Sequence, residues 1–303
     1  MFAFAKTLDA APRLADAAPG AIRAARPGES LSIESVSYDV GAVRILDDVS
    51  LSVAAGEFVC LLGPSGSGKS TILNLVAGLL RPTRGRMSCG PREVAAPSPE
   101  RALVFQDAAL FPWLTVRRNV EFALRLQGLD AGERAERSEE LLRLVHLWRF
   151  QASYPHELSG GMRQRAGIAR ALASDPAVLL MDEPFAALDA QTREILQAEI
   201  ERIWAATKKT VLFITHNVRE AVRLADRVVL MGTRPGHILH EVAVDLARPR
   251  DASDAGVARI ASDLSGRIAH EVDKVAKEEG DDAWLSTGGA VPLEPRRDLG
   301  RSR

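Results

Sequence analysis

The sequence predicts an α/β fold with a mainly parallel sheet, an antiparallel β subdomain and a helical insertion. An apolar strand over residues 57–62 runs directly into a glycine-rich loop and then into a helical pattern. Further apolar strands are predicted over residues 178–181, 211–214 and 227–230. Helical patterns separate these strands, and strands that alternate with helices pair in parallel.

The composition is that of a globular protein and indicates no particular partner. The 303 residues are 46% hydrophobic and 26% charged, which is enough apolar material for one or two domains. A net charge of -1 gives no basic surface for nucleic acid, so we expect no nucleic-acid partner. Cys60 and Cys89 lie far apart, so neither a disulfide framework nor a zinc site is expected, and a reducing compartment fits best. No segment approaches the roughly 18 to 20 apolar residues that cross a bilayer.

The first 53 residues divide into a tail and a strand pair. Residues 1–30 are rich in alanine, and charged side chains interrupt each apolar run, so we expect a disordered tail without a secretory signal. From Leu31 to Val53 apolar and polar residues alternate, with Gly41 at a turn. This alternation predicts an antiparallel strand pair.

A glycine-rich loop follows the strand at 57–62 and precedes a helical pattern over residues 70–80. The loop matches GxxxxGK[ST], a phosphate-binding pattern that requires this strand–loop–helix context. Its glycines let backbone N–H groups surround phosphate oxygens, the lysine reaches the β- and γ-phosphates, and the hydroxyl that follows binds Mg²⁺. The predicted ATP-binding residues are Gly63, Pro64, Ser65, Gly66, Ser67, Gly68, Lys69, Ser70 and Thr71.

Helical spacing on a charged background covers residues 115–149. We expect a helical subdomain over about residues 107–175, inserted between the loop and the strand at 178–181. That strand ends in two acids, Asp182 and Glu183. Asp182 is placed to hold Mg²⁺, and Glu183 is placed to act as a general base or to orient the attacking water. Together with the loop, the acids predict a nucleoside triphosphatase.

Kinases, GTPases and helicases share those two elements, so a third feature has to decide between them. The run Leu158, Ser159, Gly160, Gly161 and Met162 lies between the loop and the acids. Ser159 can cap a helix over residues 160–173, whose first N–H groups can bind a phosphate. With this run the chain resembles the ATP-binding subunits of ABC transporters over about residues 31–249, and the resemblance implies a P-loop NTPase core of ABC type spanning 31–250.

The resemblance implies a cofactor set of ATP and Mg²⁺ and a head-to-tail dimer, in which the run at 158–162 contacts the ATP of the opposite subunit. It assigns Tyr38 to stacking on adenine, with a plain strand aromatic as the alternative. It also assigns Gln106 to the Gln loop, Asp189 to the D-loop and His216 to a γ-phosphate contact. The implied catalytic residues are Glu183, His216, Gln106 and Lys69, and the implied metal ligands are Ser70, Gln106 and Asp182.

Three further runs look like the importers of nitrate, aliphatic sulfonates or taurine. They are residues 111–116, 234–237 and 242–250, and the layout with Ala/Arg-rich ends is most similar to aliphatic sulfonate importers. The partners implied are a second copy of this chain, two integral membrane permease subunits and, indirectly, a periplasmic or surface substrate-binding protein. The location implied is the cytoplasmic face of the inner membrane. Phe111 and Trp113 are then permease contacts, unless their rings pack within the helical subdomain.

The C-terminal extension, residues 251–303, contains an amphipathic helical pattern over 257–275 and then a polar tail that we expect to be disordered. The helix is suited to a solvent-facing position or to contact with a dimer partner or the membrane, and no folded sensor domain is expected. A soluble ABC ATPase that serves as an assembly factor is the alternative function of another class. A small-molecule kinase is disfavoured by the run at 158–162.

Overall fold

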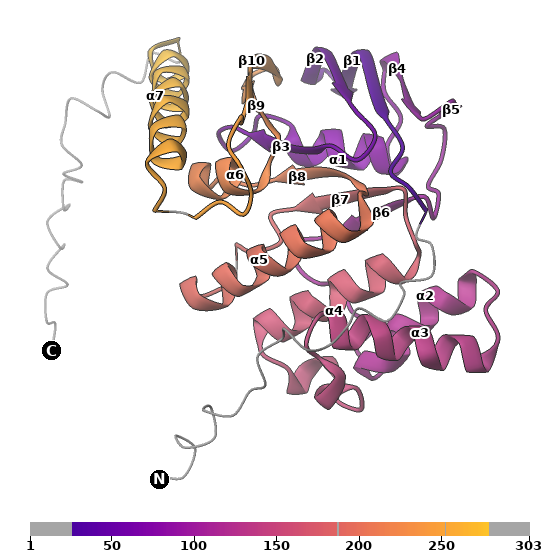
Figure 1. The fold of residues 1–303 in the computed structure, drawn as a ribbon. Coiled ribbons are helices and arrows are strands. Elements are labelled where there is room, and N and C mark those ends of the chain that lie inside the picture. The colour runs from indigo at the N-terminus through magenta and orange to yellow at the C-terminus, as the bar shows by residue number, and fades with distance from the viewer. Residues whose placement is uncertain (1–25, 187, 252, 279–303) are drawn as a thin grey trace, which may run out of the picture.

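The computed structural model describes residues 26–186, 188–251 and 253–278, which form two sheets with helices around them (Figure 1). The central sheet has the order β10-β9-β3-β8-β7-β6, and the smaller sheet has the order β2-β1-β4-β5. The central strands are β3 (Phe58–Leu62), β6 (Arg101–Val104), β7 (Val178–Asp182), β8 (Thr210–Ile214), β9 (Arg227–Gly232) and β10 (His237–Ala243). The smaller sheet contains β1 (Leu31–Val40), β2 (Val43–Val53), β4 (Arg84–Cys89) and β5 (Arg92–Glu93).

Five neighbouring strands of the central sheet run parallel, as predicted, and only β10 pairs antiparallel with its neighbour. Strand β3 lies in the middle and is buried along its whole length, because helices cover both faces of a parallel sheet. Its register places Cys60 opposite Phe213 of β8, and Phe213 is opposite Met181 of β7 on the other side. The carboxyl ends of β3, β8 and β7 therefore lie side by side.

The predicted strand pair forms the smaller sheet, with β1 between β2 and β4 in antiparallel pairing. Helix α1 (Lys69–Ala77) lies between this sheet and the central sheet (Figure 1). Its apolar side chains join Val49 of β2 and Leu61 of β3 in one buried cluster. The helix ends at Ala77, earlier than the pattern to residue 80 predicts, because Gly78 takes a left-handed φ of 79° that terminates it.

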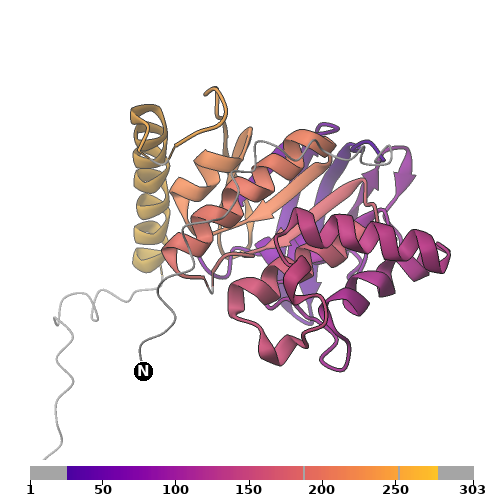
Figure 2. The same cartoon turned by 60° about the horizontal axis from the view of Figure 1, so that its bottom comes forward.

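The helical layer covers the opposite face of the central sheet and comes forward in Figure 2. It contains α2 (Val116–Leu126), α3 (Ala131–Leu144), α4 (Gly160–Ala173), α5 (Ala190–Thr207) and α6 (Val218–Leu224), with short 3-10 turns η1 (Trp148–Phe150) and η2 (Pro155–Glu157). Helices α2, α3 and α4 occupy the segment expected as a helical insertion. Apolar side chains such as Leu124, Leu142 and Ile168 join the core cluster beneath the central sheet.

Both predicted ends of the core extend further than the pattern indicates. Residues 26–30 belong to the predicted tail, but their backbone contacts the core: Arg26 N donates to Asp175 at 3.1 Å, and Glu29 O accepts from Thr210 at 2.7 Å. Helix α7 (Ala255–Glu278) buries Val257 and Leu264 in the core cluster, so its first half packs on the body instead of facing solvent. The tails expected at 1–25 and 279–303 lie outside the described residues.

Four strands of the structure are not predicted from the sequence pattern. Strands β5 and β6 have only two and four residues, β4 carries arginines and β10 is mostly half-exposed. Each lies at or near the edge of its sheet, where a strand need not be apolar throughout. The alternation that identifies a strand is therefore weak in these segments.

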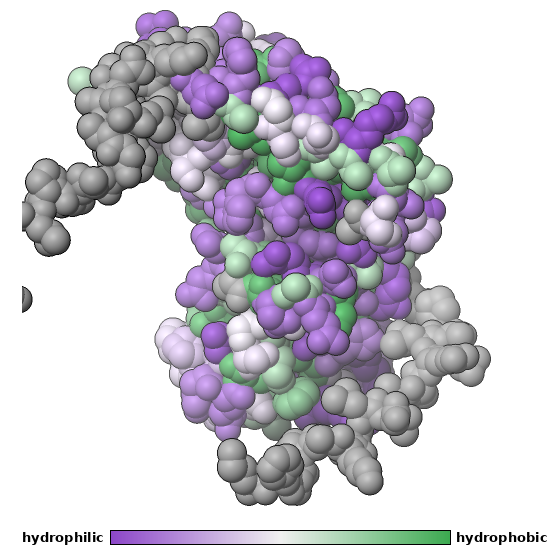
Figure 3. All heavy atoms as spheres, turned by 90° about the vertical axis from the view of Figure 1, so that its left-hand side faces the viewer, coloured by the Kyte–Doolittle hydropathy of each residue, from purple (hydrophilic) through white to green (hydrophobic). Residues whose placement is uncertain are grey.

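In the part of the chain that the structure describes, no helix combines the length and the apolar character that crossing a membrane requires. The face seen in Figure 3 mixes hydrophilic and hydrophobic residues, with the hydrophilic ones prevailing. That face is on the side where α7 lies in Figure 1.

Candidate functional site

The phosphate-loop residues form a turn between the end of β3 and the first residue of α1. Gly66 and Gly68 have φ values of 81° and 79°, a left-handed conformation that favours glycine. The Lys69 ammonium lies inside the turn, where it donates to the carbonyl oxygens of Gly63 at 2.9 Å and Pro64 at 2.8 Å. Its neighbours in the sequence, Ser65, Gly66 and Ser70, are exposed. The loop thus gathers backbone groups at a helix N-terminus, an arrangement that suits an anion.

Asp182 lies at the end of β7, next to Ser70 of the loop. Burial raises the pKa of its carboxyl, and a hydrogen bond from the Ser70 hydroxyl opposes the rise. Burial lowers the pKa of the Lys69 ammonium, while the carboxylates of Glu183 and Asp182 raise it. The Ser70 hydroxyl and the Asp182 carboxylate are hard oxygen donors, and Mg²⁺ usually binds one or two such groups together with substrate phosphates. These two residues therefore fit a magnesium ion.

Glu183 and His216 meet although 33 positions separate them. Glu183 Oε2 lies 3.0 Å from His216 Nδ1, and the Glu183 amide donates to the Ile214 carbonyl at 3.1 Å. Glu183 has a φ of 43°, a left-handed conformation that costs about 1–3 kcal/mol for a residue other than glycine. Such strain is stored where the fold needs a side chain to point in one direction. The predicted base and the predicted γ-phosphate contact are thus brought together at the edge formed by β7 and β8.

Two other predicted site residues stand apart from this cluster. Gln106 is exposed, and the carbonyl of Phe105 before it accepts from Gln164 of α4 at 3.1 Å, which anchors the Gln-loop backbone to the helical layer. Tyr38 is half-buried on β1 and packs against the cluster between the two sheets.

The run at 158–162 begins helix α4. The Ser159 hydroxyl accepts from the Met162 amide at 3.3 Å, which is the expected N-cap. Leu158 is buried, Gly160 is exposed, and a Cβ on Gly161 would lie 2.6 Å from Thr192 Cγ2 of α5. Among the polar contacts of the described residues, none joins Ser159 to the phosphate loop. The exposed start of α4 therefore presents its free N–H groups outward.

Asp189 caps helix α5 just beside that run. Its carboxylate accepts from the Thr192 amide at 2.9 Å and from the Thr192 hydroxyl at 2.7 Å. These hydrogen bonds hold the pKa of Asp189 below its usual value. Because Thr192 also contacts Gly161, the D-loop and the start of α4 form one local unit.

The turn between β9 and β10 buttresses the phosphate loop, a contact that the sequence does not reveal. A Cβ on Gly236 would lie 2.3 Å from the Ser67 carbonyl oxygen. The Gly236 amide donates to Ile45 of β2 at 2.8 Å, and its carbonyl accepts from Asp47 at 3.0 Å. In the sequence, Pro235 and Gly236 indicate a turn. The contact of this turn with the phosphate loop depends on the tertiary fold.

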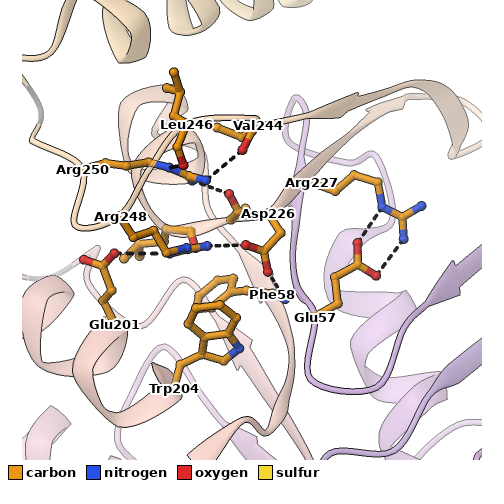
Figure 4. A network of polar contacts seen from close by, with 12 residues as sticks. Glu57, Phe58, Glu201, Trp204, Asp226, Arg227, Val244, Leu246, Arg248 and Arg250 are labelled. Carbon is orange, nitrogen blue, oxygen red and sulfur yellow. Dashed lines mark hydrogen bonds and ion pairs between the residues drawn. The ribbon is translucent and has the colours of Figure 1, made fainter. Parts of the chain in front are cut away.

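The run 242–250 is a strap that ties α5, α6 and β9 together (Figure 4). Arg248 pairs with Asp226 at 2.8 Å and with Glu201 at 3.3 Å, and its guanidinium lies 4.4 Å from the centre of the Trp204 ring. Arg250 is buried and donates to backbone carbonyls at the end of α6. These arginines thus have a structural role at the base of α6.

The two aromatic residues with a predicted partner role differ in exposure. Phe111 packs edge-on against Phe122 at 4.9 Å and lies beneath the Arg170 guanidinium at 5.4 Å. Trp113 is 70% exposed. Phe111 therefore has packing contacts within the helical layer, whereas the ring of Trp113 is accessible.

Comparison with known proteins extends these observations. Residues 46–186 match the family described as ABC transporter. A taurine import ATP-binding protein of Burkholderia pseudomallei is 51% identical over 223 residues, covering 74% of this chain and 85% of the relative. A nitrate import ATP-binding protein of a Synechocystis species is 49% identical over 206 residues, covering 68% and 77%. A solved dimeric, post-hydrolysis ATP-binding cassette with ADP and Pi has a TM-score of 0.64 and 32% identity, covering 72% of this chain and 100% of that chain.

Proposed function

This chain belongs to the ABC transporter family as one of its ATPases, and from that premise we propose that it is the ATP-hydrolysing subunit of a membrane importer. The observation that carries the proposal is the pairing of Glu183 with His216 at 3.0 Å, on the sheet edge that also holds the phosphate loop. A triphosphate on that loop would have its terminal phosphoryl group near this pair.

The loop residues bind the nucleotide. Backbone N–H groups of residues 65–71 and the ammonium of Lys69 hold the β- and γ-phosphates, with Lys69 exchanging its bonds to Gly63 and Pro64 for phosphate oxygens. Ser70 and Asp182 hold Mg²⁺, with Gln106 as a further proposed ligand. The bound ion supplies positive charge that stabilises the transferring phosphoryl group. Tyr38 is proposed to stack on the adenine ring.

Glu183 and His216 serve the hydrolytic step. A water oxygen attacks the γ-phosphorus, the bond from phosphorus to the bridging oxygen breaks, and ADP leaves. The Glu183 carboxylate orients this water and accepts its proton. His216 holds the γ-phosphate and, through Nδ1, keeps Glu183 in place.

One copy of the chain supplies only part of the proposed site. Ser159 and Gly160 are exposed at the N-terminus of α4, with Gly161 buried beside them, and this helix start is suited to a phosphate. No polar contact of the described residues brings Ser159 to its own loop. A second copy packed head to tail would place this helix start on the ATP of the first. Binding of two nucleotides then closes the dimer, and loss of phosphate opens it.

The proposed cargo is a small anion, with aliphatic sulfonates as the first candidates and taurine and nitrate as alternatives. About half of the aligned residues are identical to a taurine and to a nitrate import protein, which supports a small-anion cargo. Sulfonates come first because of the layout with Ala/Arg-rich ends. We propose two permease subunits as membrane partners, a substrate-binding protein outside, and a location at the cytoplasmic face of the membrane. Accessible Trp113 is proposed to contact a permease.

The variant Glu183→Gln tests the ATPase part of this proposal. It keeps the shape of the side chain but cannot accept the proton, so kcat should fall at least about a hundredfold. With Mg-ATP the variant should elute from a size-exclusion column as a dimer, whereas the same protein without nucleotide should elute as a monomer. A variant that stays monomeric with saturating Mg-ATP would contradict the head-to-tail site.

Growth of a strain that lacks the gene tests the cargo. Failure on an alkanesulfonate as sole sulfur source, rescued by the wild type but not by Lys69→Ala, supports sulfonate import. Failure on taurine as sole sulfur source, or on nitrate as sole nitrogen source, selects that alternative. Normal growth on all of them, with no membrane protein co-purifying, would favour a soluble assembly factor instead.

A further inference from the structure

Glu220 of α6 is a buried carboxyl group that lines the same small pocket as His216. The residue is only 5% exposed, and it lies four positions after His216. A carboxyl group that leaves water loses hydration energy, so it persists in a protein interior only where several polar partners surround it. The loops that bind nucleotide in the proposed mechanism do not include it.

The partners of Glu220 close the turn that carries His216. Glu220 accepts a hydrogen bond from the Thr215 hydroxyl, and that hydroxyl oxygen in turn accepts from the Asn217 amide at 3.0 Å. The Glu220 amide donates to Asn217 Oδ1 at 3.2 Å. The residues on both sides of His216 are thus bound to one another through Glu220, and His216 itself stays exposed.

Glu220 also joins this turn to helix α5. Its Oε1 accepts from Gln197 Nε2 at 2.7 Å, and both groups are buried. Gln197 Oε1 accepts from Arg223 at 3.0 Å, so the amide of Gln197 is held in one orientation. Helix α5 starts at the Asp189 cap, which contacts the start of α4 through Thr192. A chain of short contacts therefore leads from α5, which begins at the D-loop, to the turn that carries His216.

Charge and packing at the same place support this link. Glu183, Phe185, Arg193, Thr215 and Glu220 line one small pocket beside His216. Burial raises the pKa of the Glu220 carboxyl, and the Arg193 guanidinium of α5 is a positive charge that opposes this rise. The group therefore lies between the helix that begins at the D-loop and the pair Glu183–His216.

We propose that Glu220 is a positioning residue, which holds the turn Thr215–Asn217 at a fixed place on α5 so that His216 stays within reach of Glu183 and the γ-phosphate. The inference rests on the proposed function of His216. A displacement of about 1 Å at a reacting group can cost about a hundredfold in rate, so a loosened turn lowers kcat without removing any group that binds ATP.

The test uses the full chain and its ATPase activity. Glu220→Ala should lower kcat at least tenfold and leave the KM for ATP within twofold, while Glu220→Gln, whose carbonyl still accepts from Gln197, should stay within threefold of the wild type. Gln197→Ala should lower kcat in the same way, so the inference stays testable if Glu220→Ala does not fold. The matched control is Glu201→Ala. Glu201 is a buried carboxyl on α5, one turn after Gln197, and it pairs with Arg248 instead of the turn that carries His216. It should lower the urea midpoint but keep kcat within twofold.

The background His216→Ala separates positioning from a general loss of stability. If Glu220 acts through His216, then Glu220→Ala should change kcat less than twofold in that background. An equal loss in both backgrounds, or an unchanged kcat in Glu220→Ala and Gln197→Ala, would overturn the inference and leave the proposed function standing. If His216→Ala itself keeps full activity, the proposed role of His216 fails, and the inference fails with it.

Discussion

Arg250 is expected to be one of the most sensitive positions for stability outside the site. It is 4% exposed, and its guanidinium donates to the carbonyl oxygens of Val222 at 2.9 Å, Ala225 at 2.5 Å and Val244 at 2.8 Å. Two of these carbonyls lie at the end of α6, where a helix leaves its last carbonyls without partners. The change Arg250→Ala removes the donors and the positive charge together.

The expected loss follows from the number and kind of these bonds. A hydrogen bond from a charged group contributes about 1.5–3 kcal/mol, but burying a guanidinium costs several kcal/mol, so the bonds do not simply add. Removing one partner from a buried charged network typically costs about 3–5 kcal/mol, and we expect that loss for Arg250→Ala. For a domain of this size, it corresponds to a melting temperature lower by roughly 6–20 °C.

Urea unfolding followed by tryptophan fluorescence measures this loss. Arg250→Lys keeps the charge but not the fork of donors, so it should fall between the wild type and Arg250→Ala. The control Arg267→Ala removes an exposed partner of Asp263 on α7 and should cost at most about 0.5 kcal/mol. An Arg250→Ala protein within about 1 kcal/mol of the wild type would refute the reasoning, because the carbonyls would then have other partners.

Three further predictions concern the phosphate loop, the ion pair between Asp175 and Lys209, and the start of α4. Gly68→Ala should weaken ATP binding at least tenfold by equilibrium dialysis, because φ is 79° and the new Cβ would lie 2.4 Å from Leu46; Gly266→Ala, whose new Cβ has open space around it, should not. Burial raises the pKa of Asp175, but hydrogen bonds from Lys209 and the Arg26 amide outweigh it and leave the pKa lowered. The folded state then binds fewer protons than the unfolded state. The wild type should therefore have a higher free energy of unfolding than Asp175→Asn in urea titrations, and this difference should be full above about pH 4 and vanish as the pH falls further. Ser159→Ala should cost about 1 kcal/mol of unfolding free energy through the lost cap, and an unchanged urea midpoint would contradict that role.

Local patterns account for the parts of the candidate site whose local structure the sequence predicts. The phosphate loop, the acids at the end of β7 and the cap Ser159 each depend on neighbours within about four positions. Their geometry follows from the chemistry of a few consecutive residues. The same holds for the strand pair β1–β2 and for the buried strands of the central sheet.

Long-range contacts account for what the patterns miss. Strands β6 and β10 lie at the edges of the central sheet and are too short or too polar to be recognised alone. Gly236 looks like an ordinary turn residue, yet it lies under the phosphate loop. Glu220 and Arg250 read as surface charges on a helical or polar segment, and both are buried.

The sequence by itself determined the fold class, the phosphate loop and the order of the motifs, because backbone conformation at these places depends on adjacent side chains. Only the tertiary structure decided which distant groups meet, such as Glu183 with His216 and Glu220 with Gln197. Those meetings depend on the parallel order of β3, β8 and β7 and on the packing of α5 against α6. A contact of this kind leaves no periodic signal in the chain, since the two partners are joined by the sheet and not by their spacing.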